Sequence, residues 1–98
     1  MSRYHYILLS LYPPFPPNSE LKIRQSIQEA LIQSFGVALG STYVDIISIK
    51  DDGSEAVLRA DVGDAKPIMA SLAAYTSSMR VVKDTAFLPA LLATRVRF

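Results

Sequence analysis

YVDIISIKDDGSEAVLRADV, residues 43–62, decides the fold, because its pattern predicts a β-hairpin. Two runs rich in β-branched and apolar residues flank Asp52-Gly53, and an Asp-Gly pair in that setting is the strongest short-range hairpin signal. Glycine takes a positive φ without steric cost, and aspartate tolerates it better than most residues. We therefore predict two antiparallel strands joined by a two-residue turn.

The turn position also predicts the register of the two strands. One face should then be mostly apolar and pack on the core, while the other mixes charge with Val44, Ile46 and Val57 and is the candidate functional face. The predicted pairs are Lys50–Glu55, Ser48–Val57, Ile46–Arg59 and Val44–Asp61 on that mixed face, and Ile49–Ala56, Ile47–Leu58 and Asp45–Ala60 on the apolar face.

Composition excludes several classes of protein. The chain has 98 residues, half of them hydrophobic, which predicts one small folded domain. It has no cysteine and one histidine, His5, so thiolate metal sites and histidine clusters are excluded. A net charge of +1 gives no electrostatic case for autonomous nucleic-acid binding. No apolar run is long enough to span a membrane. A small domain with so large an apolar fraction often covers some of its apolar surface with a protein partner.

Around the hairpin, the expected elements alternate between strand and helix. We predict a strand over 3–12, a stiff proline connector over 13–18, a helix over 19–35, a second helix beginning at Asp64 and a strand over 79–87. The order βαββαβ predicts an α+β fold, ferredoxin-like or RRM-like, with a four-stranded antiparallel sheet and two helices on one face. We expect one RRM-like domain over 1–98, closed by a short apolar segment over 88–98.

The residues that known proteins of this topology use to bind nucleobases, phosphate or small molecules are missing from the sequence. The outward residues of the third strand offer no ring for base stacking, and the 13–18 loop has no arginine for binding phosphate, as acylphosphatases need. Its four prolines argue against the glycine-containing loop of small-molecule-binding modules. Asp51-Asp52 and the Asp61/Asp64 pair are explained by a turn and a helix cap rather than a cation. We expect a non-enzyme with no metal and no cofactor.

Four segments together resemble one known family. They are YHYILLSLY (residues 4–12), the Phe35-Gly36 pair, LRADV (58–62) and MRVVKDTAFLPALLA (79–93). Their order and spacing resemble the small RRM-like protein subunits of nuclear ribonuclease P and ribonuclease MRP. Within that family the ending looks most like the accessory paralogue of the fungal processing-of-precursor series.

The resemblance implies a non-catalytic subunit of a particle whose catalyst is RNA. Such subunits support assembly and position the RNA for 5′ processing of precursor tRNA and for rRNA processing, in the nucleus and nucleolus. The implied partners are a paralogous RRM-like subunit, a TIM-barrel-like subunit and the ribonuclease P or MRP RNA, contacted directly or through other subunits. The nearly balanced charge of this chain favours a mainly protein-facing role.

Two sets of residues are candidate contact sites. Taken singly, each apolar one is better explained as ordinary core or scattered surface, and the basic ones are equally well explained as a solvated tail. The protein-interface candidates are Ile32, Val44, Ile46, Val57, Ala70, Ala74, Leu88, Leu91 and Leu92. The candidates for RNA phosphate contacts are Arg80, Lys83, Arg95 and Arg97. The alternative is a self-associating ferredoxin-like module that binds a small ligand or regulates an enzyme, and it predicts a symmetric homodimer through the open sheet face.

Overall fold

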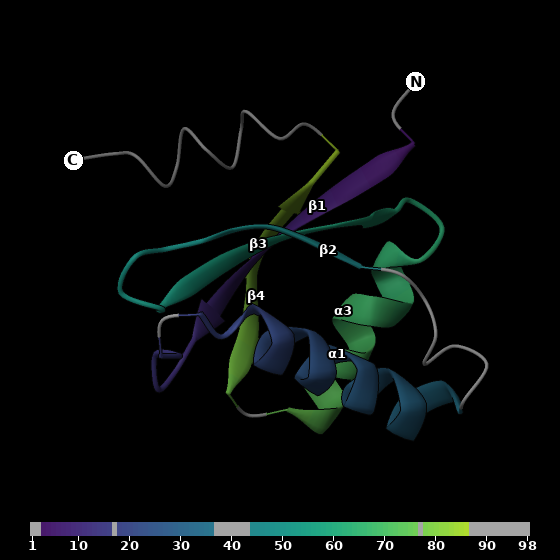
Figure 1. Ribbon diagram of the computed structural model, residues 1–98. Coiled ribbons are helices and arrows are strands. Elements are labelled where there is room, and N and C mark those ends of the chain that lie inside the picture. Colours follow the sequence, from purple (N-terminus) through teal and green to yellow (C-terminus); the bar gives the residue numbers. More distant parts are fainter. Residues whose placement is uncertain (1–2, 17, 37–43, 77, 87–98) are drawn as a thin grey trace.

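The computed structural model describes residues 3–16, 18–36, 44–76 and 78–86. Its elements follow the predicted order: β1 (Tyr4–Leu11), α1 (Glu20–Phe35), β2 (Asp45–Ile49), β3 (Glu55–Asp61), α3 (Ala65–Tyr75) and β4 (Met79–Thr85) (Figure 1). The four strands form one sheet in the order β2-β3-β1-β4, and every neighbouring pair is antiparallel. The predicted α+β, ferredoxin-like βαββαβ fold is confirmed.

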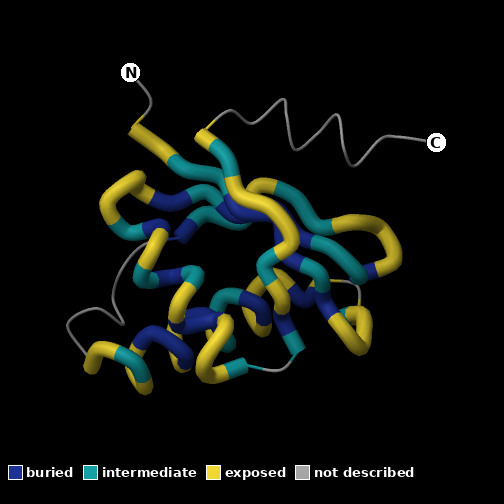
Figure 2. Tube along the Cα trace, turned by 180° about the vertical axis from the view of Figure 1, so that it is seen from behind, coloured by how far each residue is buried: buried dark blue, intermediate teal, exposed yellow. Residues whose placement is uncertain are grey.

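The core lies between the sheet and the two helices, which pack against each other on one face (Figures 1 and 2). Alternate residues of β1 face the helices, because successive side chains of a strand point to opposite sides. Ile23 and Ile27 of α1 and Ile68 and Leu72 of α3 are buried against them. The sheet contributes Ile7, Leu9, Leu11, Ala56, Leu58 and Ala60 to the same cluster.

Helical spacing predicts that one stripe of α1 is buried, made of Ile23, Ile27, Ala30, Leu31, Ser34 and Phe35. The prediction is wrong at Phe35, which is exposed. Residues of an α-helix advance by about 100° each. That rotation takes Phe35 well round from Ile23 and Ile27, and it is also the final residue of the helix. Gly36 ends the helix, as glycine often does because it tolerates a positive φ. Its φ is +88° and its N–H donates to the carbonyl of Ile32 at 2.8 Å. At the other end, Ser19 bonds the carbonyl of Pro16 and makes no side-chain cap.

The hairpin turn is joined to the proline loop that follows β1. The N–H of Phe15 donates to the carbonyl of Gly53 at 2.9 Å, and the N–H of Leu11 donates to Ser54 at 2.7 Å. Gly53 has φ +76°, the left-handed conformation predicted for the turn glycine. The turn therefore holds the start of the connector in place as well as reversing the chain.

The predicted hairpin register is confirmed next to the turn and wrong beyond it. Ser48 pairs with Val57 and Ile49 with Ala56, as predicted. An irregularity at Ile47 then shifts the register by one residue, as a β-bulge does. The pairs that result are Ile46–Leu58 and Asp45–Arg59, in place of the predicted Ile46–Arg59, Ile47–Leu58 and Asp45–Ala60. A one-residue shift reverses which side chains face the core.

The turn also lowers the pKa of Asp52 below the ordinary 3.8, because the Ser54 hydroxyl and then its backbone N–H donate to the carboxylate, at 2.6 and 2.9 Å. A carboxyl whose pKa is depressed by folding stabilises the protein above its ordinary pKa, and that contribution is lost as pH falls through the folded value.

We expect Ser54→Ala to raise the pKa of Asp52, measured by carboxyl NMR titration. Ser26→Ala on α1 is the control, and an unchanged pKa in Ser54→Ala would contradict the assignment.

Candidate protein-interaction surfaces

The outward side of α1 carries three large apolar side chains. Leu21, Ile32 and Phe35 are 66, 44 and 48% exposed. Their spacings of 11 and 3 residues place them on one side of a helix, opposite the buried stripe of Ile23 and Ile27. Ile32, an interface candidate, lies off the buried stripe, as helical spacing predicts. Leu21 was missed, although the same periodicity could have found it. A role of this side in binding stays a prediction.

On α3, the small residues Ala70 and Ala74 are exposed, as their candidate role requires. Ser71 between them is buried, and its hydroxyl donates to the carbonyl of Pro67 at 2.8 Å. It is therefore part of the packing of α3 on the protein. Only the two alanines, with the neighbouring exposed Ala73, are available for a close approach by another backbone.

Of the three hairpin candidates, Val44 and Val57 are buried and Ile46 is half-buried, so the hairpin does not present the outward apolar surface that was predicted. Val44 is 5% exposed and belongs to the core, and Ile46 is half-buried against it. The bulge at Ile47 is the reason, because it turns the preceding residues toward the helices. Val57 does face away from the helices, but it is 0% exposed and packs with Leu8 and Tyr6.

The register shift builds a polar cluster that the sequence-based pairing did not contain. Asp45 now lies opposite Arg59, whose Nε donates to the Asp45 carboxylate at 3.0 Å. The hydrogen bond that the guanidinium donates to Asp45 raises the pKa of Arg59. The guanidinium also lies over the ring of Tyr4, with 4.6 Å between its central carbon and the ring centroid. Arg59 thus covers one face of the Tyr4 ring.

The basic candidates divide between described and undescribed residues. Arg80 and Lys83 are exposed on β4, where either could reach a phosphate. Asp84 of the same strand is engaged within the chain, by Nε2 of His5 at 2.7 Å. The candidates Leu88, Leu91, Leu92, Arg95 and Arg97, with the expected apolar segment over 88–98, lie outside the described residues.

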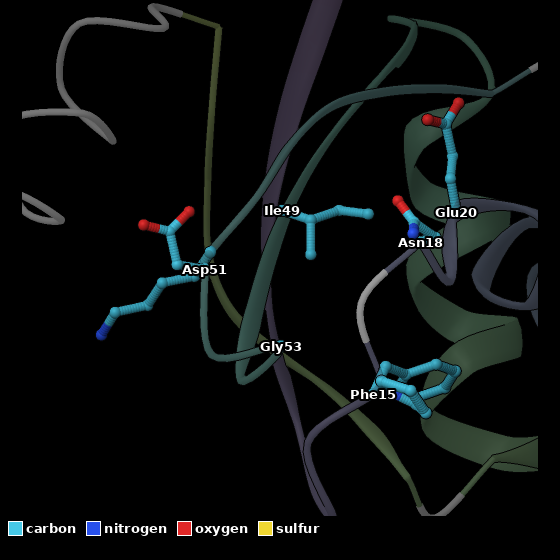
Figure 3. A pocket seen from close by; sticks show the side chains of 8 residues that line it. Phe15, Asn18, Glu20, Ile49, Asp51 and Gly53 are labelled. Carbon is cyan, nitrogen blue, oxygen red and sulfur yellow. The ribbon is translucent and has the colours of Figure 1, made fainter.

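A hollow of about 300 Å³ lies between the hairpin turn, the proline loop and the first turn of α1. Figure 3 shows Ile49, Asn18 and Phe15 around it, with the Asp51 carboxylate directed away from them. Asn18 has φ +62°, an uncommon conformation for a residue other than glycine. The polar groups here do not converge on one point, so the hollow does not have the geometry of a reaction centre.

Two further features are absent from residues 3–16, 18–36, 44–76 and 78–86. They contain no group of three or more histidine, aspartate or glutamate side chains arranged to hold a metal ion. They also contain no helix with the length and apolar character needed to cross a membrane.

The arrangement of strands and helices defines a ferredoxin-like, RRM-like domain. No family model matches the chain, and no curated protein matches it. Ten chains of solved structures match it. One of them belongs to the cryo-EM structure of yeast ribonuclease MRP, with a TM-score of 0.71 and 17% sequence identity, covering 98% of this chain and 89% of that chain. At this identity, the likeness shows a shared fold over nearly the whole of both chains.

Proposed function

We propose that this chain is a non-catalytic protein subunit of a ribonucleoprotein ribonuclease of the ribonuclease P and MRP class. The observation that carries the proposal is the fold shared, over 98% of the chain, with a chain of the yeast ribonuclease MRP structure. It agrees with a family resemblance that rests on different evidence, the four quoted sequence segments. Fold alone does not imply function, so the agreement of two separate lines matters.

The geometry of the candidate surfaces favours a role in assembling the particle over a catalytic role. The described residues carry no converging catalytic groups, and the accessible candidates are the apolar side of α1 and the alanines of α3. Exposed apolar groups of this kind are typical of protein-interaction surfaces. In the proposed role, the chain supports assembly of the particle and positions its RNA for precursor tRNA and rRNA processing, mainly through protein contacts.

In its finer form, the proposal names the family member and the setting. The resemblance of the ending is greatest to subunit eight of the processing-of-precursor series. The proposed partners are a paralogous RRM-like subunit and a TIM-barrel-like subunit, and the proposed location is the nucleus and nucleolus. RNA contact, where it occurs, would use Arg80 and Lys83 among the described residues.

The test is to tag the chain in its native cell, purify it gently and sequence the RNA that accompanies it. We expect enrichment of the ribonuclease P RNA, the ribonuclease MRP RNA or both, relative to a tagged unrelated RRM-like protein. Absence of both RNAs, together with a discrete self-associated species by light scattering, would remove the proposal and support the self-associating module.

Two neighbouring exposed residues of α1 provide a matched pair of variants for the same purification. Ile32→Glu places a charge in the apolar side of α1, whereas Gln33→Glu places the same charge just beside it. An interface contact of moderate strength corresponds to about a tenfold change in affinity. We expect RNA recovery to fall with the first variant and not with the second. Equal recovery would exclude this side of α1 from the interface while leaving membership of the particle intact.

A further inference from the structure

A groove of about 560 Å³ runs between α3 and β4, and the proposed function draws on Ala73 and Arg80 of its lining but gives the groove itself no occupant. Met69 and Ala73 line it from the helix, and Met79 and Val81 line it from the strand. Met69 and Val81 are half-buried and Ala73 is exposed. Thr76 and Arg80 complete the lining, so the groove is apolar on its facing sides and also carries polar groups, and solvent reaches it.

The backbone of β4 faces this groove at the edge of the sheet. In the order β2-β3-β1-β4, no described strand lies beyond β4. The carbonyl of Ser78 accepts the N–H of Tyr12 at 3.0 Å, so Ser78 points its polar backbone groups toward β1. Directions alternate along an antiparallel strand. Met79 and Val81 accordingly direct their N–H and C=O groups outward, and their side chains line the groove.

The positive charge along the edge of β4 favours an acidic occupant over a second copy of the chain. Arg80 and Lys83 are exposed, and neither forms an ion pair with a described residue. The acid of the strand, Asp84, is engaged by His5. A second copy paired antiparallel along β4 would bring basic side chains near their own equivalents, which is unfavourable. An acidic segment has the complementary charge.

We infer that the edge of β4 and its groove bind an extended, acidic segment of a partner protein, added as a fifth strand. Backbone pairing with Met79 and Val81 would supply the register, and alternate apolar side chains would enter the groove. Val82 is an extra residue where the β1–β4 register shifts, which limits regular pairing to the stretch before it. The inference rests on the proposed function only for the setting in which such a partner occurs.

The experiment uses synthetic peptides, which need no knowledge of the natural partner. The full chain is titrated with a capped Glu-Val-Glu-Val-Glu-Val peptide, and amide NMR shifts and hydrogen exchange are followed. We expect the amides of Met79 and Val81 to shift and to gain protection. The equivalent Lys-Val peptide should bind at least about tenfold more weakly, since like charges meet across the strands. The acidic peptide N-methylated at alternate amides should also lose binding, because its side chains are unchanged and only main-chain donors are removed.

Variants on α3 and β4 separate the groove from the surrounding surface. Ala73→Glu puts a carboxylate into the groove, while Ala74→Glu puts one on the same exposed helix outside it. We expect the first to weaken the acidic peptide by about tenfold and the second by less than about twofold. Arg80→Glu should reverse the preference between the acidic and basic peptides. Both helix positions are exposed, so these variants should leave the fold intact.

Several outcomes would overturn the inference. They are unperturbed Met79 and Val81 amides with saturating peptide, equal binding of the two charge types, full binding of the N-methylated peptide, or equal effects of the two α3 variants. None of them bears on RNA co-purification, so failure here is distinguishable from failure of the proposed function. Conversely, if the peptide binds at β4 but no ribonuclease RNA accompanies the tagged chain, the proposal of a peptide-binding edge stands and the proposal of membership in the ribonuclease particle fails.

Discussion

Alanine in place of Gly53 is expected to destabilise the protein by about 3–5 kcal/mol, the sum of backbone strain and overpacking. Gly53 has φ +76°, which residues with a Cβ rarely adopt. A Cβ at this position would also overlap the carbonyl oxygen of Phe15, which is backbone and cannot move aside as a side chain would. Relief requires the turn and the proline loop to separate, with loss of the 2.9 Å bond from Phe15 to Gly53.

Two other glycines provide graded controls for this prediction. Gly36 has φ +88°, but beyond its chain neighbours a Cβ added there would meet no atom of a described residue within 4 Å, so its alanine variant isolates strain, about 1–3 kcal/mol. Gly63 does not have a positive φ, and a Cβ there would meet no atom of the described residues beyond its chain neighbours, so alanine there should change stability by less than about 0.5 kcal/mol. Urea unfolding followed by circular dichroism measures all three. If Gly53→Ala unfolds at the same urea concentration as Gly63→Ala, the contact between turn and proline loop is wrong.

Val44→Asp is expected to cost about 3–5 kcal/mol, because it buries a carboxylate without a dedicated partner. Val44 is 5% exposed and lies in the main core cluster. The nearest candidate cation is Arg24, which already donates to the carbonyl of Val44 at 2.6 Å. Turning toward a new carboxylate would remove that bond. The pairing expected from the sequence, which puts Val44 on the outer face, predicts almost no effect instead.

The control for this substitution lies three residues further along the chain. Ile47 occupies the bulge and is 37% exposed, so Ile47→Asp should cost only about 1 kcal/mol, through lost strand propensity. Chemical unfolding of both variants, read as free energies at zero denaturant, decides between the two registers. A larger loss for Ile47→Asp than for Val44→Asp would contradict the bulge.

The sequence was sufficient for the topology and for the part of the hairpin nearest the turn. Element order follows from the alternation of strand and helix periods, and Asp52-Gly53 has a specific backbone requirement that fixes its neighbours. The buried positions of the helices followed from their periodicity only in part: Phe35 of α1 and Ala73 of α3 lie on the predicted stripes but are exposed, and Ser71 of α3 lies off its stripe but is buried. These are local patterns, so a single sequence contains them.

The candidate site depended on information that the sequence does not carry locally. An extra residue at Ile47 has no compositional signal, since isoleucine suits a regular strand equally well. That single residue moved Val44 and Ile46 into the core and brought Asp45 to Arg59. The groove beside β4 was missed for a different reason, because its lining comes from two elements whose contact is tertiary.

The central place of β1 has a consequence for the chain as it leaves the ribosome. β1 pairs only with β3 and β4 among the described strands, and both are synthesised later. Translation proceeds from the N-terminus at about 5–20 residues per second. For the first seconds, the nascent chain therefore carries an aliphatic strand and an α1 sequence with no sheet to join. Translation slowed before β3 would prolong that exposure, whereas a delay after β4 would have no such effect on the sheet.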